Sequence, residues 1–378
     1  MQFAVIGAGV IGTVHAGAIS TLGAPARLAL VADEIPERAA KLARAYGAEH
    51  TSSAADAFAR DDIEAVAICT PSGTHAELAV AALKAGKHLI VEKPIDVTPA
   101  AAAAIMRSEA EAAAQGPAVV TVISQHRFDP ASQVVHRAVR EGRFGRITSG
   151  LASIAWWRSQ DYYDSGAWRG TWALDGGGAL MNQGVHTVDL LVWLLGDPVE
   201  VYAHTARLAH ERIEVEDTAV ATITFAGGAL GIVHATTAAY PGLTARLQIH
   251  GDRGSAIIDG DRLAYFHTAA GDGAAAGDGV GSDVNRVAAE LLEPSAPNPS
   301  AGSDPAALSD AHAAQYRDFL DAIEAGRPPL VTTAEAARTL AVIHAIYDSA
   351  RTGRPVTVAL PDRLPGLAPG DAPAPVKG

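Results

Sequence analysis

The sequence predicts an α/β protein with a doubly wound parallel sheet in its N-terminal third, followed by a second, largely antiparallel domain. Three observations carry this prediction. Short apolar runs alternate with helical patterns up to about residue 127, a glycine-rich turn follows the first run, and longer strand-like stretches dominate after residue 145. The length of 378 residues is sufficient for two or three domains with apolar cores.

The N-terminal strands are expected in runs that are short, apolar and rich in β-forming residues. They are 2–7, 26–33, 64–69, 88–92 and 119–125. Segments 36–46 and 74–85 carry alanine, leucine and charged residues at helical spacing, and glycine follows each one. We therefore expect a first domain over residues 1–127.

The second domain is expected over residues 128–360. Its predicted strands are 147–157, 199–208, 216–225, 229–237, 245–250 and 255–259. Its predicted helices are 178–195, 309–325 and 333–351. Segment 269–308 is rich in glycine, alanine, serine, proline and aspartate, so we interpret it as a mobile flap or arm, and 361–378 as a flexible tail.

The composition excludes several classes of protein. The net charge of −13 and the lack of basic runs argue against nucleic-acid binding. The single cysteine, Cys69, excludes an intrachain disulfide and a cysteine-based metal cluster, and no metal site is expected. No apolar stretch reaches the ~18 residues of a membrane span, so a soluble, cytoplasmic protein is the expectation.

The first glycine-rich turn has the spacing of a dinucleotide-binding fingerprint. Gly7, Gly9 and Gly12 follow a strand and open a helix, and Asp33 ends the next strand. A pyrophosphate could then lie at the helix N-terminus, against Gly9, Val10 and Ile11. Asp33 would bind the ribose hydroxyls and repel a 2′-phosphate, which favours NAD over NADP, although Arg38 lies within reach of a phosphate.

Two further strand ends carry polar residues at the ligand-binding edge of such a sheet. Thr70 and Pro71 end one strand, and His75 begins the next helix, where it either lines the nicotinamide site or caps local backbone. Glu92 and Lys93 end the next strand, and a lysine beside a nicotinamide can stabilise an alkoxide.

Asn182, His186 and Asp189 have the i, i+4, i+7 spacing of one polar stripe on an otherwise apolar helix, directly after Gly176–Gly178. A polar stripe on such a helix should face a partner or a cavity. Because the pKa of histidine lies near neutrality, His186 is the candidate general base.

Four of the five tryptophans lie within residues 156–172, together with Arg158, Arg169, Tyr162 and Tyr163. Trp157, Trp168 and their neighbours could line a sugar pocket, or they could belong to a core or an interface.

These motifs, over about residues 1–360, resemble the Gfo/Idh/MocA oxidoreductase family. The resemblance rests on the glycine fingerprint, Thr70-Pro71, Glu92-Lys93-Pro94 and the helix that follows the glycine triplet. It implies an N-terminal Rossmann domain and a C-terminal α+β domain with a large, mostly antiparallel open sheet, which supplies substrate contacts and the oligomer interface.

The resemblance implies catalytic roles for Lys93 and His186. Asn182 stands where inositol dehydrogenase-like members have aspartate, and an amide cannot take a proton, so Asn182 can only orient the substrate or His186. Some nucleotide-sugar 3-dehydrogenases look similar in having asparagine here. The candidate substrate contacts are Lys93, Arg127, Trp157, Arg158, Tyr163, Trp168, Asn182 and His186; the candidate cofactor contacts are Gly7, Gly9, Val10, Ile11, Gly12, Asp33, Arg38, Thr70, Pro71, His75, Glu92 and Lys93.

The sequence therefore predicts an NAD-dependent dehydrogenase of a sugar, glycoside or cyclitol hydroxyl, with ring C3 as a candidate position, assembled as a homodimer or homotetramer through the C-terminal sheet. One alternative is an NAD-dependent enzyme that cleaves glycosidic bonds by transient oxidation, although its Tyr-Pro-Thr-His-Gly run is absent. The other is a non-catalytic NAD-binding regulator.

Overall fold

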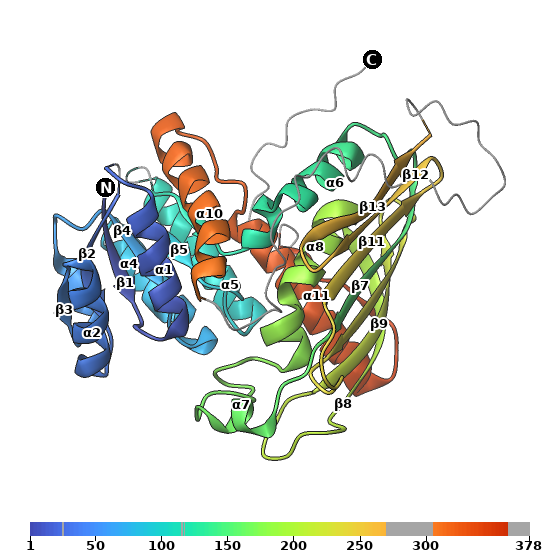
Figure 1. Ribbon diagram of the computed structural model, residues 1–378, viewed down its shortest axis with the longest axis horizontal. Helices are drawn as coiled ribbons and strands as arrows, with labels where there is room; N and C mark the ends of the chain where they lie inside the picture. The colour runs from blue at the N-terminus through green and yellow to red at the C-terminus, as the bar shows by residue number, and fades with distance from the viewer. Residues whose placement is uncertain (25, 115, 117, 270–304, 362–378) are drawn as a thin grey trace.

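The computed structural model describes residues 1–361 except 25, 115, 117 and 270–304. Two sheets stand side by side, each with its own helices (Figure 1). The expected flap at 269–308 and the tail at 361–378 lie almost entirely outside the described residues. Within the described ranges, no helix is both long and apolar enough to cross a membrane.

The N-terminal sheet has six parallel strands in the order β3-β2-β1-β4-β5-β6. Their bounds are β1 Gln2–Ile6, β2 Arg27–Ala32, β3 Glu49–Thr51, β4 Ala65–Ile68, β5 His88–Val91 and β6 Val120–Val122. The strands β1, β4 and β5 lie in the middle and are almost fully buried, because helices cover both faces. The predicted doubly wound sheet is confirmed, whereas the short and exposed β3 was not predicted.

Helices joining or following these strands are α1 Val10–Thr21, α2 Pro36–Tyr46, α3 Ala54–Ala59, α4 His75–Lys84, α5 Pro99–Ala113 and α6 Pro130–Arg140. A seventh helix comes from the far end of the chain: α10, Pro305–Ala325, packs beside α1 (Figure 1). Tyr316 and Phe319 of α10 lie with their ring centroids 5.6 and 6.4 Å from that of Phe3 in β1. The range 128–360 therefore contributes one helix to the core of the first sheet.

The second sheet has eight strands in the order β13-β12-β11-β7-β10-β9-β8-β14. Their bounds are β7 Ile147–Ala155, β8 Pro198–Ala206, β9 Thr218–Phe225, β10 Leu230–Thr236, β11 Ala245–Gly251, β12 Gly254–Asp259, β13 Arg262–Thr268 and β14 Val356–Thr357. Only the pair β7–β10 is parallel, so the predicted, mostly antiparallel open sheet is confirmed.

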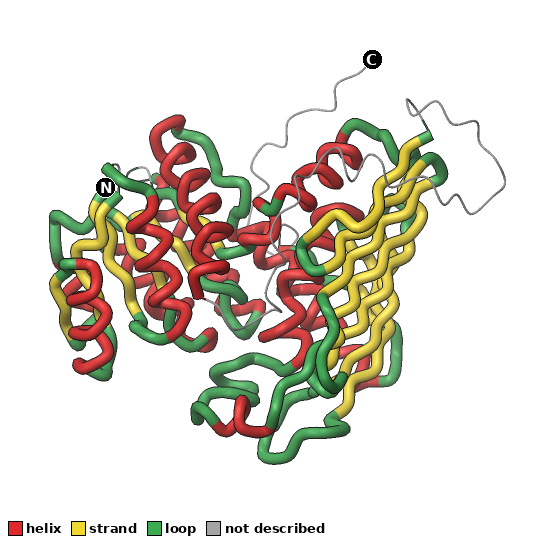
Figure 2. The backbone as a smooth tube through the Cα atoms, in the orientation of Figure 1, coloured by secondary structure: helices red, strands yellow, loops and turns green. Residues whose placement is uncertain are grey.

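Helices cover one face of this sheet only (Figures 1 and 2). The principal ones are α8, Val185–Leu195, and α11, Thr333–Thr352. The uncovered face exposes large apolar side chains along β8, β9 and β10: Tyr202, Val220, Leu230 and Ile232. We call these four residues the open apolar face.

Candidate functional site

The glycine-rich turn between β1 and α1 has three glycines with three different surroundings. Gly7 has a φ of +98°, and a Cβ at this position would lie 2.6 Å from the Cys69 carbonyl oxygen. A Cβ on Gly12 would lie only 1.9 Å from the Gly7 oxygen, so this glycine permits α1 to pack against the turn. A Cβ on Gly9 would meet nothing within 4 Å, which leaves open space at the start of the helix.

The N-terminus of α1 is suited to bind an anion. Gly9 is its N-cap, no side chain caps the first turn, and Val10 is 72% exposed. The free N–H groups and the helix dipole therefore face open space, as a pyrophosphate requires. These observations fit the predicted dinucleotide site.

Asp33 lies beside this turn at the end of β2. Its carboxylate accepts hydrogen bonds from the Ala8 N–H at 2.7 Å and the Ile35 N–H at 2.8 Å. Asp33 is thus held next to the glycine turn, where a ribose would lie. Arg38 is exposed on α2.

His75 connects the ends of two neighbouring strands. Its ring nitrogens lie 2.9 Å from the Pro94 oxygen and 3.0 Å from the Thr70 oxygen, and the residue is 1% exposed. Of the two predicted roles, these contacts correspond to binding of local backbone: His75 fixes the segment after β4 against the segment that contains Lys93.

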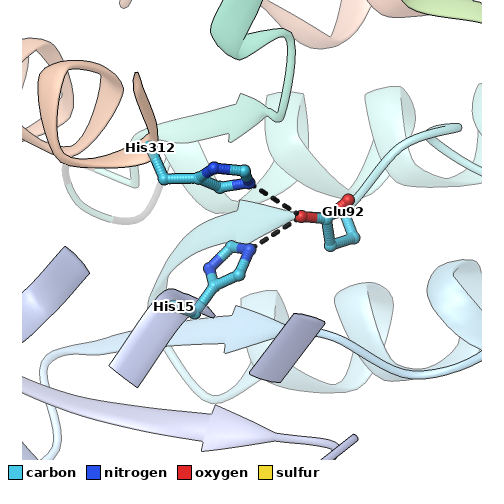
Figure 3. Close-up of side chains that lie close together, drawn as sticks. All are labelled: His15, Glu92 and His312. Atoms are coloured by element: carbon cyan, nitrogen blue, oxygen red, sulfur yellow. Dashed lines mark hydrogen bonds and ion pairs between the residues drawn. The ribbon is translucent and has the colours of Figure 1, made fainter. Parts of the chain in front are cut away.

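Glu92 is the centre of a buried cluster with His15 of α1 and His312 of α10 (Figure 3). His15 donates from Nε2 to Glu92 Oε1 at 2.7 Å, His312 Nε2 lies 3.4 Å from the same oxygen, and Tyr316 OH lies 2.7 Å from His15 Nδ1. Burial raises the pKa of Glu92, but the hydrogen bonds from the two histidines outweigh it and hold the pKa well below its usual range. Glu92 therefore joins α1, β5 and α10 and fixes the backbone that bears Lys93.

Lys93 and His186 line the same small cavity. Lys93 Nζ donates a hydrogen bond to the Asn182 carbonyl oxygen at 2.9 Å. This bond uses one of the three N–H donors of the ammonium group. Burial lowers the pKa of Lys93, against the opposing effects of Glu92 and Asp175. The cavity thus combines a cation with an imidazole.

His126 lies edge-on to His186, with 5.1 Å between the ring centroids. Burial lowers the pKa of His126, but Asp261 and Asp129 outweigh it and raise the pKa to about 9. Burial, together with the positive charges of His126 and Lys93, places the pKa of His186 well below its usual range. His186 is therefore uncharged at neutral pH and able to accept a proton.

Asn182 does not lie in a regular α-helix. Residues Ala179–Gly184 form a π-helical turn (η3) before α8 begins, so the regular spacing assumed for the polar stripe does not apply. Asn182 Nδ2 donates to Asp175 Oδ1, and Asn182 Oδ1 accepts from Gln183 Nε2 at 2.7 Å. Because a carboxylate can only accept, the orientation of the Asn182 amide is fixed.

Asp189 has different partners from Asn182 and His186. It is 4% exposed and forms a bidentate ion pair with Arg127, which is 1% exposed and also contacts Glu335 at 2.6 Å. The Asp189 carboxylate further accepts hydrogen bonds from Ser124 and Thr339. His186 and Asp189 of α8 line the same cavity, so the predicted polar stripe holds for these two residues and fails for Asn182, which lies in η3. Arg127 lies in a buried ion pair with Asp189.

The predicted aromatic contacts have unequal exposure. Tyr163 is 5% exposed, packs on Ile213 and Val215 and hydrogen-bonds Thr237, so it belongs to a small core. Trp157 and Trp168 are half-buried. Arg158 donates to Gln183 Oε1 at 3.0 Å from Nε and 2.8 Å from Nη2, which joins it to the neighbour of Asn182.

Sequence reasoning missed two carboxylates near η3. Asp175 precedes the glycine triplet and Asn182 follows seven residues later, a spacing that could have suggested their contact. Glu216 accepts from the Gly178 and Leu180 N–H groups, and burial raises its pKa to about 7. No sequence signal reveals Glu216, because it lies on a loop far along the chain.

Comparison with known proteins agrees with these features. The model of an oxidoreductase family with an NAD-binding Rossmann fold matches residues 1–121, and that of the GFO/IDH/MocA C-terminal domain matches residues 132–257. The chain is 34% identical to the inositol 2-dehydrogenase of Rhizobium meliloti (strain 1021) over 278 residues, which are 72% of this chain and 80% of that protein.

Two solved structures are also similar over nearly the whole chain. The WlbA dehydrogenase from Bordetella pertussis, in complex with NADH and UDP-GlcNAcA, has a TM-score of 0.81 and 32% identity, covering 95% of this chain and 98% of that one. Levoglucosan dehydrogenase in complex with NADH has a TM-score of 0.81 and 28% identity, covering 95% of this chain and 99% of that one.

Proposed function

Because the chain belongs to the Gfo/Idh/MocA oxidoreductase family, we propose that it transfers hydride between NAD and a secondary hydroxyl or ketone of a sugar, glycoside or cyclitol. The resemblance predicted from the motifs is confirmed, and so is the class, an NAD-dependent dehydrogenase. Ring C3 is our candidate position, because asparagine at residue 182 resembles the pattern of nucleotide-sugar 3-dehydrogenases.

The observation that carries the proposal is that Lys93 and His186 line one cavity. Lys93 follows Glu92, which is hydrogen-bonded to His15 of α1, the helix that begins at the glycine turn. The cation and the nucleotide-binding turn thus belong to one connected edge of the N-terminal sheet, and the neutral base on α8 lies across the cavity from the cation.

Bound NAD supplies the acceptor for the hydride when a hydroxyl is oxidised. Lys93 can donate two further hydrogen bonds besides the one to the Asn182 oxygen, and its charge lowers the pKa of a hydroxyl that it contacts. His186, uncharged at neutral pH, then takes the hydroxyl proton. Lys93 stabilises the negative charge that develops on the oxygen.

Asn182 has a positioning role in this scheme. Its amide cannot accept the proton, and both of its polar atoms already have partners, Asp175 and Gln183. It therefore holds the backbone oxygen that orients the Lys93 ammonium.

The test is an assay of NAD reduction with a panel of sugars, glycosides and inositols, with the position of oxidation read from the product. Lys93→Met should lower kcat more than ~100-fold, and His186→Asn by ~100- to 10,000-fold, while NADH binding stays intact. The matched controls are Lys84→Met and His50→Asn, at exposed positions of the N-terminal domain. Near-normal turnover in either site variant would refute the role of that residue.

If no member of the panel reduces NAD although the protein binds NADH, the protein acts as a regulator and the proposal fails. Cleavage of a glycosidic bond without net reduction of NAD would instead identify the glycoside-cleaving alternative.

We also propose that the protein is a homodimer or homotetramer joined through the open apolar face. Tyr202 is 40% exposed, Val220 46%, Leu230 59% and Ile232 51%, and all four lie on neighbouring strands. Thr222 lies between Tyr202 and Ile232 on the same face, and a sheet face that exposes several large apolar side chains in this way is typical of an interface.

A further inference from the structure

Arg158 and Arg169 form no ion pair with a carboxylate among the described residues, although hydrogen bonds connect them to the segment that binds Lys93. Both side chains are half-buried, yet no ion pair within 4 Å involves either of them in the part of the chain that the structure describes. Arg127, in contrast, is buried and uses two carboxylates. Asp175 is close enough to Arg169 to interact with it electrostatically, but the two form no ion pair, so both guanidinium groups can still gain a direct anionic partner from a ligand.

The guanidinium groups of both arginines lie over aromatic rings. Arg169 lies 4.3 Å from the ring centroid of Tyr162 and 4.5 Å from that of Trp168, and Arg158 lies 5.2 Å from the centroids of Trp156 and Tyr162. A cation–π contact of this kind involves no N–H hydrogen bond, so it does not by itself occupy the guanidinium donors.

Each guanidinium group keeps N–H donors that form no hydrogen bond with another described residue. Arg158 uses Nε and Nη2 for Gln183, and Arg169 uses Nη1 for Tyr162 OH. Arg158 Nη1, and Nε and Nη2 of Arg169, have no partner among the described residues. A guanidinium edge of this type binds a carboxylate or phosphate with two parallel hydrogen bonds.

A hydrogen-bond chain connects both arginines to the reacting groups. Gln183 Nε2 donates to Asn182 Oδ1 and to Tyr162 OH at 2.9 Å, and Tyr162 OH accepts from Arg169 at 2.7 Å. Asn182 in turn accepts from Lys93 at its backbone oxygen. The two arginines are therefore separated from Lys93 only by Tyr162, Gln183 and Asn182.

The local charge is also unbalanced. Burial lowers the pKa of Lys93, the carboxylates of Glu92 and Asp175 act against it, and Arg169 and Arg158 lower it further, so three cations and two carboxylates lie within electrostatic reach of one another. The carboxylate of Asp175 is 2% exposed and is already used by the Asn182 amide and the Gly170 N–H. In a chain with a net charge of −13, a cluster of three cations is a distinct local feature.

We propose that Arg158 and Arg169 form an oxyanion subsite, so that the substrate is a sugar bearing a carboxylate or a phosphate group near the oxidised hydroxyl. This inference rests on the proposed dehydrogenase function and specifies its substrate class.

The experiment compares matched substrates that differ in one charged group: glucose, glucuronate and glucose 6-phosphate, and the corresponding galactose set, each with NAD. The value of kcat/KM for a carboxylate or phosphate member should exceed that of its neutral counterpart by about 10- to 100-fold, as one hydrogen bond between charged groups provides. The preferred member identifies which of the two groups is bound.

Arg158→Gln and Arg169→Gln should each reduce this preference, mainly through a higher KM for the anionic member. Arg246→Gln, at an exposed position on β11, is the control and should leave the preference unchanged. Calorimetric titration of the same sugars into the protein–NADH complex gives a readout that does not depend on turnover.

Equal kcat/KM or equal affinity for charged and neutral members would overturn the oxyanion subsite while leaving the dehydrogenase function intact. A preference that survives both arginine variants would also overturn it. If none of the sugars is turned over but the anionic members bind more tightly and lose this advantage in both variants, the subsite stands and the proposed reaction fails.

Discussion

Gly9→Ala and Gly12→Ala should affect different properties, cofactor binding and stability, although the two residues lie three positions apart in one turn. A Cβ at Gly12 would lie 1.9 Å from the Gly7 oxygen, whereas real Cβ atoms keep at least 3.0 Å from such atoms, so backbone must move by about 1 Å. We expect Gly12→Ala to lower the free energy of unfolding by about 3 kcal/mol, the upper end for overpacking, because backbone cannot rotate away as a side chain can.

Gly9→Ala should leave the fold nearly intact and weaken cofactor binding. A Cβ at Gly9 meets nothing within 4 Å, so the cost to stability is about 0.5–1 kcal/mol, from a poorer helix N-cap. The methyl group would enter the space assigned to the pyrophosphate. Losing one hydrogen bond to a charged group corresponds to an increase of about 10- to 100-fold in the Kd for NADH.

The assays are urea denaturation for stability and fluorescence titration for the Kd of NADH. Gly227→Ala is the control, since a Cβ there also meets nothing within 4 Å and the residue lies in the β9–β10 hairpin of the other sheet. Wild-type NADH affinity in Gly9→Ala would refute the placement of the pyrophosphate, and wild-type stability in Gly12→Ala would refute the close packing of α1.

Four other perturbations test separate features. Asp33→Ser should raise kcat/KM with NADP relative to NAD, because the charge facing a 2′-phosphate is lost; an unchanged ratio would contradict the assignment. Ile232→Lys on the open apolar face should give a monomer by light scattering, and a wild-type mass would remove that face as the interface. Arg127→Leu should cost about 3–5 kcal/mol in urea unfolding, because it leaves its partner carboxylates buried and unpaired. Because His186 must lose its proton to act, the acid limb of kcat/KM against pH should lie below pH 6.5, and His126→Gln should shift it to higher pH by removing a positive neighbour; an unshifted limb would show that this neighbour has no effect.

Features that depend on residues close together in the sequence, such as the central strands and the glycine turn, could be predicted. The central strands are short apolar runs, and Gly7, Gly9 and Gly12 lie where a strand, a turn and a helix meet, so the nucleotide-binding half followed from patterns within about 30 residues. Lys93 is a candidate because it ends such a strand, and His186 because of the polar spacing after the glycine triplet; the structure places both at one cavity, and their catalytic roles stay predictions.

The parts that depend on contacts between distant residues could not be predicted. The spacing of Asn182, His186 and Asp189 assumed a regular helix, but η3 changes the rotation per residue before α8 begins. Arg127 was predicted to contact the substrate, and only the fold reveals that Asp189, 62 residues later, forms an ion pair with it. Nothing in the sequence of α10 indicates that it packs on the first sheet instead of the second.

The return of α10 to the N-terminal sheet has a consequence for biosynthesis. The ribosome delivers β1 first and Tyr316 more than 300 residues afterwards, so the nascent nucleotide-binding half lacks part of its apolar cover until the chain is nearly complete. A gene fragment ending after β6 should therefore yield an aggregation-prone product, whereas a fusion that appends residues 305–325 to that fragment should restore solubility.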